Sequence, residues 1–135
     1  RALDYVHEEG LMHRDVKPAN VLVTEHGRAQ LADFGMAREA MEGSKSITVS
    51  CGTPLWMAPE VLWGGKYGPA VDVWAAGVMF FQLLCGDFAE SSWPFSTGVP
   101  LTGTLPALHS AITATDVQWH LLPEDSPGPI KELLK

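Results

Sequence analysis

The chain has 135 residues, of which 46% are hydrophobic and 19% are charged. This length allows one compact domain or part of a larger one, and the composition excludes a disordered chain. A net charge of −7 without a basic patch argues against binding to nucleic acid. Cys51 and Cys85 match no disulfide framework or zinc site and indicate reduced thiols, and no apolar run approaches the roughly 20 residues of a membrane span.

The N-terminal half predicts a helix end followed by a β-hairpin. The first ten residues, "RALDYVHEEG", have the spacing of an amphipathic helix that ends at Gly10. A polar loop, "MHRDVKPAN", follows over residues 12–20. Two short apolar runs, Val21–Thr24 and Ala29–Ala32, flank a turn that contains glycine, so we expect them to pair as a hairpin.

The remainder of the chain is expected to be mainly helical. "DFG" at 33–35 breaks the second strand, and residues 36–52 form a long exposed loop rich in Ser and Thr. "APEVLW" (58–63) predicts a short helix. "AVDVWAAGVMFFQLLCG" (70–86) is apolar nearly all round, which predicts a helix that is buried on every side.

The C-terminal part gives weaker signals. Residues 86–104 are rich in Gly, Pro, Ser and Thr and predict an irregular loop, in which only Pro94 and Phe95 are recognisable markers. A helix is expected around 107–114 and another in "PIKELLK" at the end of the chain. Neither end carries a helix start or stop signal, so we expect a fragment that is cut at both ends.

Four motifs occur in a set order: "HRDVKPAN", "DFG", "GTPLWMAPE" and "DVWAAG". Each alone is weak evidence, but their order and their predicted loop, hairpin and helix contexts are specific together. The chain resembles the catalytic C-terminal lobe of a eukaryotic protein kinase of the Ser/Thr type. The resemblance covers residues 1 to about 95 well and the remainder loosely.

The resemblance implies an α+β fold that is mainly α-helical, a kinase-like C-terminal lobe with a small β-hairpin and without the N-terminal lobe. Residues 1–135 would form a partial kinase domain, with the catalytic loop at 13–20, the activation segment at 33–60 and the central helix at about 70–85. The glycine-rich loop and the strand lysine of the N-terminal lobe are absent from this sequence. The parent chain would have to supply them.

The polar residues of the loop fit phosphoryl transfer, which needs a positioned nucleophile and compensation of phosphate charge. By the resemblance, Asp15 accepts the proton of a substrate hydroxyl, and Lys17 places a cation beside the transferred group. Asn20 and Asp33 offer oxygen ligands to Mg²⁺, which prefers them. The alternative for each is a polar residue that only caps a loop or hairpin.

Arg14 precedes the catalytic aspartate, and two interpretations remain open for it. In related kinases such an arginine binds a phosphate on the activation loop and orders that loop. Here Val49 occupies the usual phosphorylated position, and Thr48 and Ser50 flank it, so a shifted site is one interpretation. A permanent contact with a carboxylate or a carbonyl group is the other.

Other residues take roles from the resemblance. Thr53 matches the residue that bridges the catalytic aspartate and lysine, which favours Ser/Thr over Tyr as substrate. Leu22 would lie under the adenine ring of ATP. Ala19 replaces an acid that favours basic substrates. Asp72 is expected to accept backbone N–H bonds from the catalytic loop. The resemblance also implies structural roles for His13, Phe34 and Glu60.

The leading hypothesis is a fragment of a protein kinase that transfers the γ-phosphate of ATP, with Mg²⁺, to Ser or Thr of protein substrates. A second hypothesis is a pseudokinase-like or truncated lobe that binds proteins without catalysis, through the surface near Met57 and Trp63. A lipid or small-molecule kinase is disfavoured by the protein-type "GTPLWMAPE". The expected location is the cytoplasm, with the nucleus as the alternative.

The sequence also predicts a missing ion pair. In the family Glu60 is buried against an arginine late in the lobe, and no arginine follows Arg38 here. A buried carboxylate without its partner costs on the order of 3–5 kcal/mol. We therefore expect the isolated chain to be marginally stable, and we expect natural downstream residues to raise its melting temperature in calorimetry. An unchanged melting temperature would contradict the pairing.

Overall fold

The computed structural model describes residues 1–40, 55–96 and 104–124. Its first part contains helix α1 (Ala2–Glu8), strand β1 (Leu11–Met12) and an antiparallel hairpin of β2 (Val21–Val23) and β3 (Ala29–Leu31). In the hairpin Val21 pairs with Leu31 and Val23 with Ala29. The predicted hairpin is therefore confirmed. The helix ends slightly earlier than expected, with Glu9 as its C-cap and Gly10 following in the left-handed conformation.

A second strand pair lies within the stretch for which the sequence predicted only a loop. Strand β4 (Arg38–Glu39) runs antiparallel to β1, with Leu11 opposite Glu39 and Met12 opposite Arg38. The loop prediction is wrong for β4, because two-residue strands carry no detectable periodicity. The remainder of the predicted loop, residues 41–52, lies outside the described residues.

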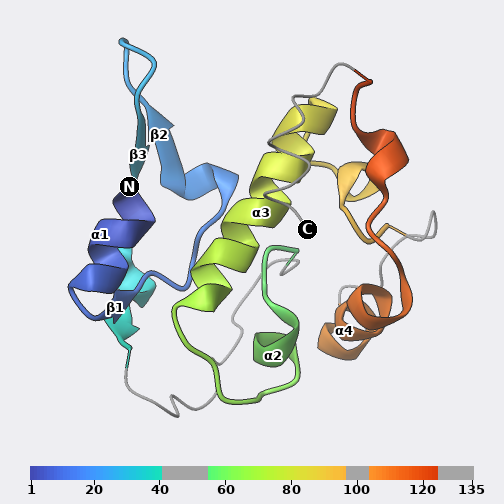
Figure 1. The fold of residues 1–135 in the computed structure, drawn as a ribbon, viewed down its shortest axis with the longest axis horizontal. Coiled ribbons are helices and arrows are strands. Elements are labelled where there is room, and N and C mark those ends of the chain that lie inside the picture. The colour runs from blue at the N-terminus through green and yellow to red at the C-terminus, as the bar shows by residue number, and fades with distance from the viewer. Residues whose placement is uncertain (41–54, 97–103, 125–135) are drawn as a thin grey trace.

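Three helices form the rest of the architecture: α2 (Pro59–Leu62), α3 (Ala70–Cys85) and α4 (Leu105–Ala114). Prolines in the first turns of α2 and α4 suit helix starts, and Gly86 ends α3 with a positive φ of 89°. Helix α3 runs through the centre, with α1 and the hairpin on one side and α2 and α4 on the other (Figure 1). The expected helix at 107–114 is confirmed, whereas the expected final helix lies outside the described residues.

The central helix is not buried on every side, which corrects the expectation from its composition. Val73, Phe80 and Leu83 lie on one exposed face of α3, while Val71, Val78 and other apolar residues are buried on the opposite side. An apolar composition shows that a helix has buried surface, but it does not show which face is covered. Within the described residues, no helix is long and apolar enough to cross a membrane.

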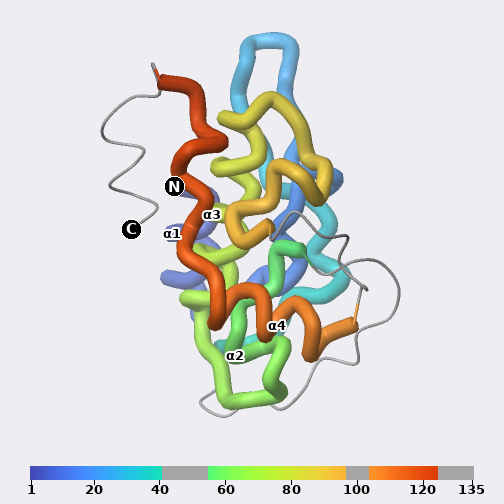
Figure 2. The backbone as a smooth tube through the Cα atoms, turned by 90° about the vertical axis from the view of Figure 1, so that its right-hand side faces the viewer, coloured from blue at the N-terminus to red at the C-terminus, as the bar shows by residue number. Residues whose placement is uncertain are grey.

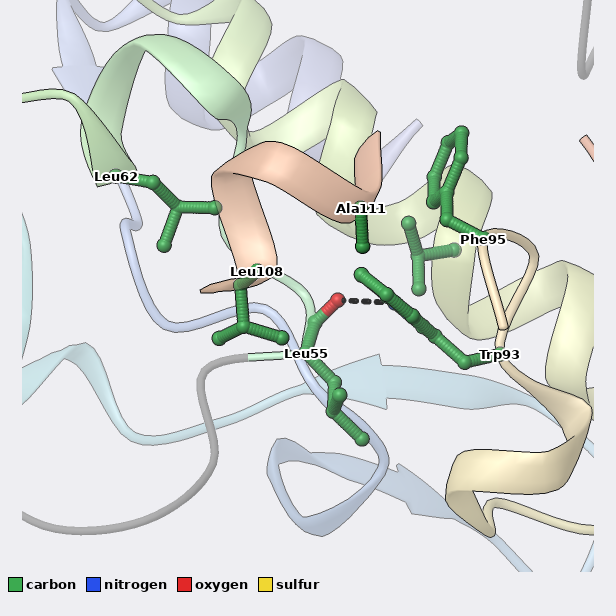
Figure 3. Packing of buried hydrophobic residues seen from close by; sticks show 7 residues of the cluster. Leu55, Leu62, Trp93, Phe95, Leu108 and Ala111 are labelled. Atoms are coloured by element: carbon green, nitrogen blue, oxygen red, sulfur yellow. Dashed lines mark hydrogen bonds between the residues drawn. The ribbon is translucent and has the colours of Figure 1, made fainter. Parts of the chain in front are cut away.

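The main core lies between α2, α3, α4 and the stretch that precedes α4 (Figure 3). Its buried members are Leu55, Leu62, Val78, Trp93, Phe95, Leu108 and Ala111. The Trp93 indole N–H donates a 2.8 Å hydrogen bond to the Leu55 carbonyl. Part of the stretch that was predicted to be irregular therefore supplies central core residues.

Two further contacts tie the C-terminal part to α3. The Trp74 ring packs against the main core and also against a smaller cluster that consists of Met12, Ala58, Tyr67 and Val71. The last described residues run along α3 (Figure 2), where the Trp119 ring contacts Phe81 and the Leu121 carbonyl accepts a hydrogen bond from the Cys85 thiol. These contacts attach the last described residues to the C-terminal half of α3.

Replacing Trp93 with Phe should destabilise the chain by about 2–4 kcal/mol, because it leaves a cavity and an unpaired Leu55 carbonyl. Urea unfolding followed by circular dichroism measures this loss. The matched control is Trp63→Phe, since that side chain is 75% exposed and the change should cost less than about 0.5 kcal/mol. Equal effects of the two changes would contradict the packing described here.

Candidate active site

The catalytic loop is attached to α3 by one buried carboxylate. Asp72, 1% exposed in the first turn of α3, accepts the backbone N–H of Arg14 on Oδ1 at 2.7 Å and that of His13 on Oδ2 at 2.8 Å. The sequence predicted these two bonds, and the structure contains both. His7 adds a third bond that the sequence did not predict, from Nε2 to Oδ2 at 2.9 Å. The only sequence feature that could have indicated this bond was the position of His7, a polar residue, on the apolar face of α1.

His13 connects the catalytic loop to the DFG turn. Its buried ring donates from Nε2 to the Ala32 carbonyl at 3.0 Å, and its Nδ1 accepts the backbone N–H of Asp15 at 3.3 Å. These partners require the neutral ring with its proton on Nε2. The ring also meets Phe34 edge-on, with centroids 4.7 Å apart. His13 and Phe34, to which the resemblance gives structural roles, thus contact each other directly.

Three side chains of the loop converge on one another. Lys17 Nζ lies 3.0 and 2.8 Å from the two carboxylate oxygens of Asp15. The Asn20 amide nitrogen donates to the Asp15 carbonyl and to its Oδ2, each at 2.8 Å. The Asp15 carboxylate is therefore held in one orientation by a cation and an amide.

Asp33 follows a residue that is bonded to both ends of this loop. Ala32, which precedes it, donates its N–H to the Asn20 carbonyl at 2.8 Å and accepts the His13 ring N–H. Asp33 itself has a positive φ of 60°, and its Oδ1 accepts the Gly35 N–H at 3.2 Å. These contacts hold Ala32, the residue before Asp33, against His13 and Asn20, at the two ends of the loop.

The donor set fits a magnesium ion. The Asn20 nitrogen is occupied by Asp15, which leaves its amide oxygen for a metal, and Asp33 retains its second carboxylate oxygen. Hard oxygen ligands suit Mg²⁺, which is usually bound by one or two protein groups together with phosphates and water. Among the described residues, no three His, Cys, Asp or Glu side chains gather as a metal cage.

Arg14 makes contacts with neutral groups. Its Nε donates to the Met36 carbonyl at 2.8 Å, and its Nη1 donates to the Tyr67 hydroxyl at 3.1 Å. The contact with a carbonyl group, one of the two interpretations left open, is therefore present. Thr48 and Ser50, the residues of the other interpretation, lie outside the described residues, as does Thr53.

Leu22 is exposed as its expected role requires, whereas Glu60 is less buried than expected. Leu22 is on β2 with 55% of its side chain exposed, available to a flat apolar ligand. Glu60 is only half-buried, and no ion pair of Glu60 is found in the described part of the chain. The expected cost of an unpaired, buried Glu60 is therefore too large, because a partly hydrated carboxylate keeps much of its solvation.

Cys85 belongs to the packing rather than to the site. Burial raises the pKa of its thiol, and the nearby Asp87 carboxylate adds to this shift. A raised pKa reduces the thiolate fraction at neutral pH, which disfavours nucleophilic chemistry. Cys85 is a free thiol, as the sequence predicted.

The site and the fold together have the features of a kinase-type phosphotransferase. Residues 1–96 match the family described as protein kinase domain, and the chain belongs to this family. The resemblance inferred from the four motifs is thereby confirmed.

Similar curated proteins are protein kinases. The chain is 47% identical over 85 residues to protein kinase C eta type of Mus musculus and 49% identical over 86 residues to ribosomal protein S6 kinase-related protein of Homo sapiens. It is 47% identical over 88 residues to calcium/calmodulin-dependent protein kinase type 1 of Macrobrachium nipponense. These matches cover 63%, 64% and 63% of the chain but only 12%, 21% and 25% of the relatives. The chain thus spans a quarter of these relatives or less.

Replacing Asp72 with Asn should loosen the start of the catalytic loop, because an amide nitrogen would face a donor and one backbone N–H would lose its acceptor. We expect a loss of about 3–5 kcal/mol in unfolding free energy and faster hydrogen exchange at the His13 and Arg14 amides. NMR hydrogen exchange measures both amides. The control is Asp116→Asn at an exposed position, and unchanged exchange in Asp72→Asn would contradict the anchoring role.

Proposed function

We propose that the protein that contains this chain is a serine/threonine protein kinase and that the chain forms part of its C-terminal lobe. The reaction would transfer the γ-phosphate of ATP to a Ser or Thr hydroxyl of a protein substrate. The observation that supports this proposal is the fixed group of Asp15, Lys17 and Asn20, together with the hydrogen bond between Asn20 and Ala32, the residue before Asp33. A lone loop of polar residues would not need this degree of mutual orientation.

Each side chain of this group has a role in the proposed reaction. The hydroxyl oxygen forms a bond to the γ-phosphorus, the bond from that phosphorus to the bridging oxygen breaks, and the hydroxyl proton passes to Asp15. Lys17, already at the Asp15 carboxylate, offsets negative charge near the transferred group. When bound, Mg²⁺ would neutralise phosphate charge. Asn20 and Asp33 would hold that ion.

The N-terminal lobe of the parent protein would complete the nucleotide site. Leu22 offers an exposed apolar surface for the adenine ring, and the family's glycine-rich loop and strand lysine would have to come from outside this chain. Thr53 would bridge Asp15 and Lys17. Without the N-terminal lobe, this chain alone is expected to be inactive. The proposed location is the cytoplasm, with the nucleus as the alternative.

Regulation is proposed to act through Arg14. Its guanidinium is half-buried at the end of the DFG turn, and Thr48 and Ser50 are the proposed phosphorylation sites that would deliver a phosphate to it. An arginine–phosphate pair is charge-assisted and bidentate, and this makes it a strong way to order a loop.

The second candidate function is a protein-binding module without catalysis. Trp63 supports it, since this ring is largely exposed and stacks on His109 with centroids 4.9 Å apart. Exposed aromatic side chains often anchor protein interfaces. The presence of all four polar residues of the proposed catalytic group favours the kinase.

In the full-length protein, Asp33→Ala should lower phosphoryl transfer by at least about 100-fold, because the nucleotide-bound metal loses a carboxylate ligand. Transfer of labelled phosphate from ATP to a mixed protein substrate, titrated with Mg²⁺, is the assay. Asp116→Ala, which removes an exposed carboxylate elsewhere, serves as the control. Absence of transfer in the wild type would favour the binding module.

A further inference from the structure

Tyr67 lies in the turn between α2 and α3 and has no role in the site described so far. Its side chain is 7% exposed, and its ring belongs to the small cluster with Met12, Ala58 and Val71. From this cluster the hydroxyl group reaches Arg14, 53 residues away in the sequence, and accepts a hydrogen bond from Nη1 at 3.1 Å. The hydroxyl of a buried tyrosine therefore holds the Arg14 guanidinium by one hydrogen bond.

The guanidinium of Arg14 is held at two points by neutral groups. The Tyr67 hydroxyl binds Nη1, and the Met36 carbonyl binds Nε at 2.8 Å. No carboxylate forms an ion pair with Arg14 among the residues that the structure describes. Of its five N–H groups, these two bonds use two, so the others have no partner within the same residues.

Neutral anchors have a consequence that acidic anchors would not have. A carboxylate in the same place would cancel the charge of the guanidinium and compete with any anion for its N–H groups. A phenol and a carbonyl fix the direction of the planar group and leave its charge uncompensated. Within the part of the chain that the structure describes, the arrangement thus presents an oriented cation with N–H groups that no described residue accepts.

We propose that Tyr67 is a positioning residue whose hydroxyl holds the Arg14 guanidinium against the Met36 carbonyl, ready to accept a phosphate group. The phosphate part rests on the proposed function, in which Arg14 is the regulatory receptor. The positioning part rests on the contacts alone. Because the Arg14 backbone is bonded to Asp72, Tyr67 also couples the catalytic loop to the turn that ends at Met36.

The conservative change Tyr67→Phe isolates the hydroxyl, since the ring keeps its packing. In the ¹⁵N-labelled 135-residue chain, the Arg14 Nε–H should exchange with solvent more slowly than those of the other three arginines, whose side chains are exposed: Arg1, Arg28 and Arg38. In Tyr67→Phe the Arg14 Nε–H signal should exchange about tenfold faster, because the guanidinium loses its bond at Nη1 and its remaining bond to Met36 then opens more often. The Arg14→Lys variant assigns the signal by its disappearance.

Two controls separate positioning from simple packing. Tyr5→Phe makes the same chemical change at a side chain that is 65% exposed, and it should leave the Arg14 signal unchanged. The backbone amide of Leu62, bonded to the Ala58 carbonyl in the same region, reports general loosening. Equal acceleration at Leu62 and Arg14 would show that Tyr67 only packs. Unchanged Arg14 exchange in Tyr67→Phe, or fast exchange in the wild type, would also overturn the proposal.

Titration with inorganic phosphate tests the receptor part. Phosphate should shift the Arg14 Nε–H signal in the wild type, and Tyr67→Phe should require about tenfold more phosphate for the same shift. A wild-type signal that phosphate does not move would overturn the receptor role. A full-length protein without phosphoryl transfer would instead remove the proposed function, and the exchange result at Arg14 would stand unaffected.

Discussion

The carboxylate of Asp72 accepts hydrogen bonds from two consecutive backbone N–H groups and from His7, and the position of the catalytic loop depends on these bonds. A buried charge is costly unless its hydrogen-bonding capacity is filled, and here three donors from two separate segments fill it. The rigid support is α3, whose remaining length packs against the core. The position of the loop is therefore fixed by its bonds to α3 and not by the local sequence of the loop alone.

This anchoring explains how the site tolerates two unusual backbone conformations. Arg14 and Asp33 are the non-glycine residues with positive φ in the described part of the chain, at 66° and 60°. Each such residue costs about 1–2 kcal/mol relative to an ordinary conformation. Asp72 holds the Arg14 backbone, whereas the Gly35 N–H and the flanking contacts of Ala32 and Phe34 hold Asp33.

Much of this arrangement could be predicted from the sequence, for identifiable reasons. The hairpin follows from two apolar runs around a glycine turn, and the grouping of Asp15, Lys17 and Asn20 follows from their closeness in one loop. Asp72 could be predicted only through the family resemblance, because its partners are 58 and 59 residues away. The family resemblance was needed to predict contacts between residues far apart in the sequence. Local patterns were enough for residues within one loop.

The missed features share a physical cause. His7 and Tyr67 act through single hydrogen bonds to residues 65 and 53 positions away, and neither periodicity nor composition records such a pair. The strand pair β1–β4 is too short to show alternation, and Trp93 belongs to a stretch whose turn-forming composition conceals its core contacts. The burial of Glu60 was overestimated because a family role was carried over without its geometry.

Some apolar side chains near the candidate site are exposed, whereas others are buried. Leu22 and Val23 on the hairpin and Phe34 in the DFG turn are exposed, whereas Met12, His13 and Asp72 are almost fully buried. Exposing large apolar groups costs about 25 cal/mol for each Å² left in water, and a cluster of such groups commonly marks a binding surface. In the proposed kinase, Leu22 would face the nucleotide. Asn20, a member of the polar group with Asp15 and Lys17, directly precedes the strand that carries Leu22. In the proposed kinase, Leu22 would meet the flat adenine base, and the polar group would meet the charged phosphates.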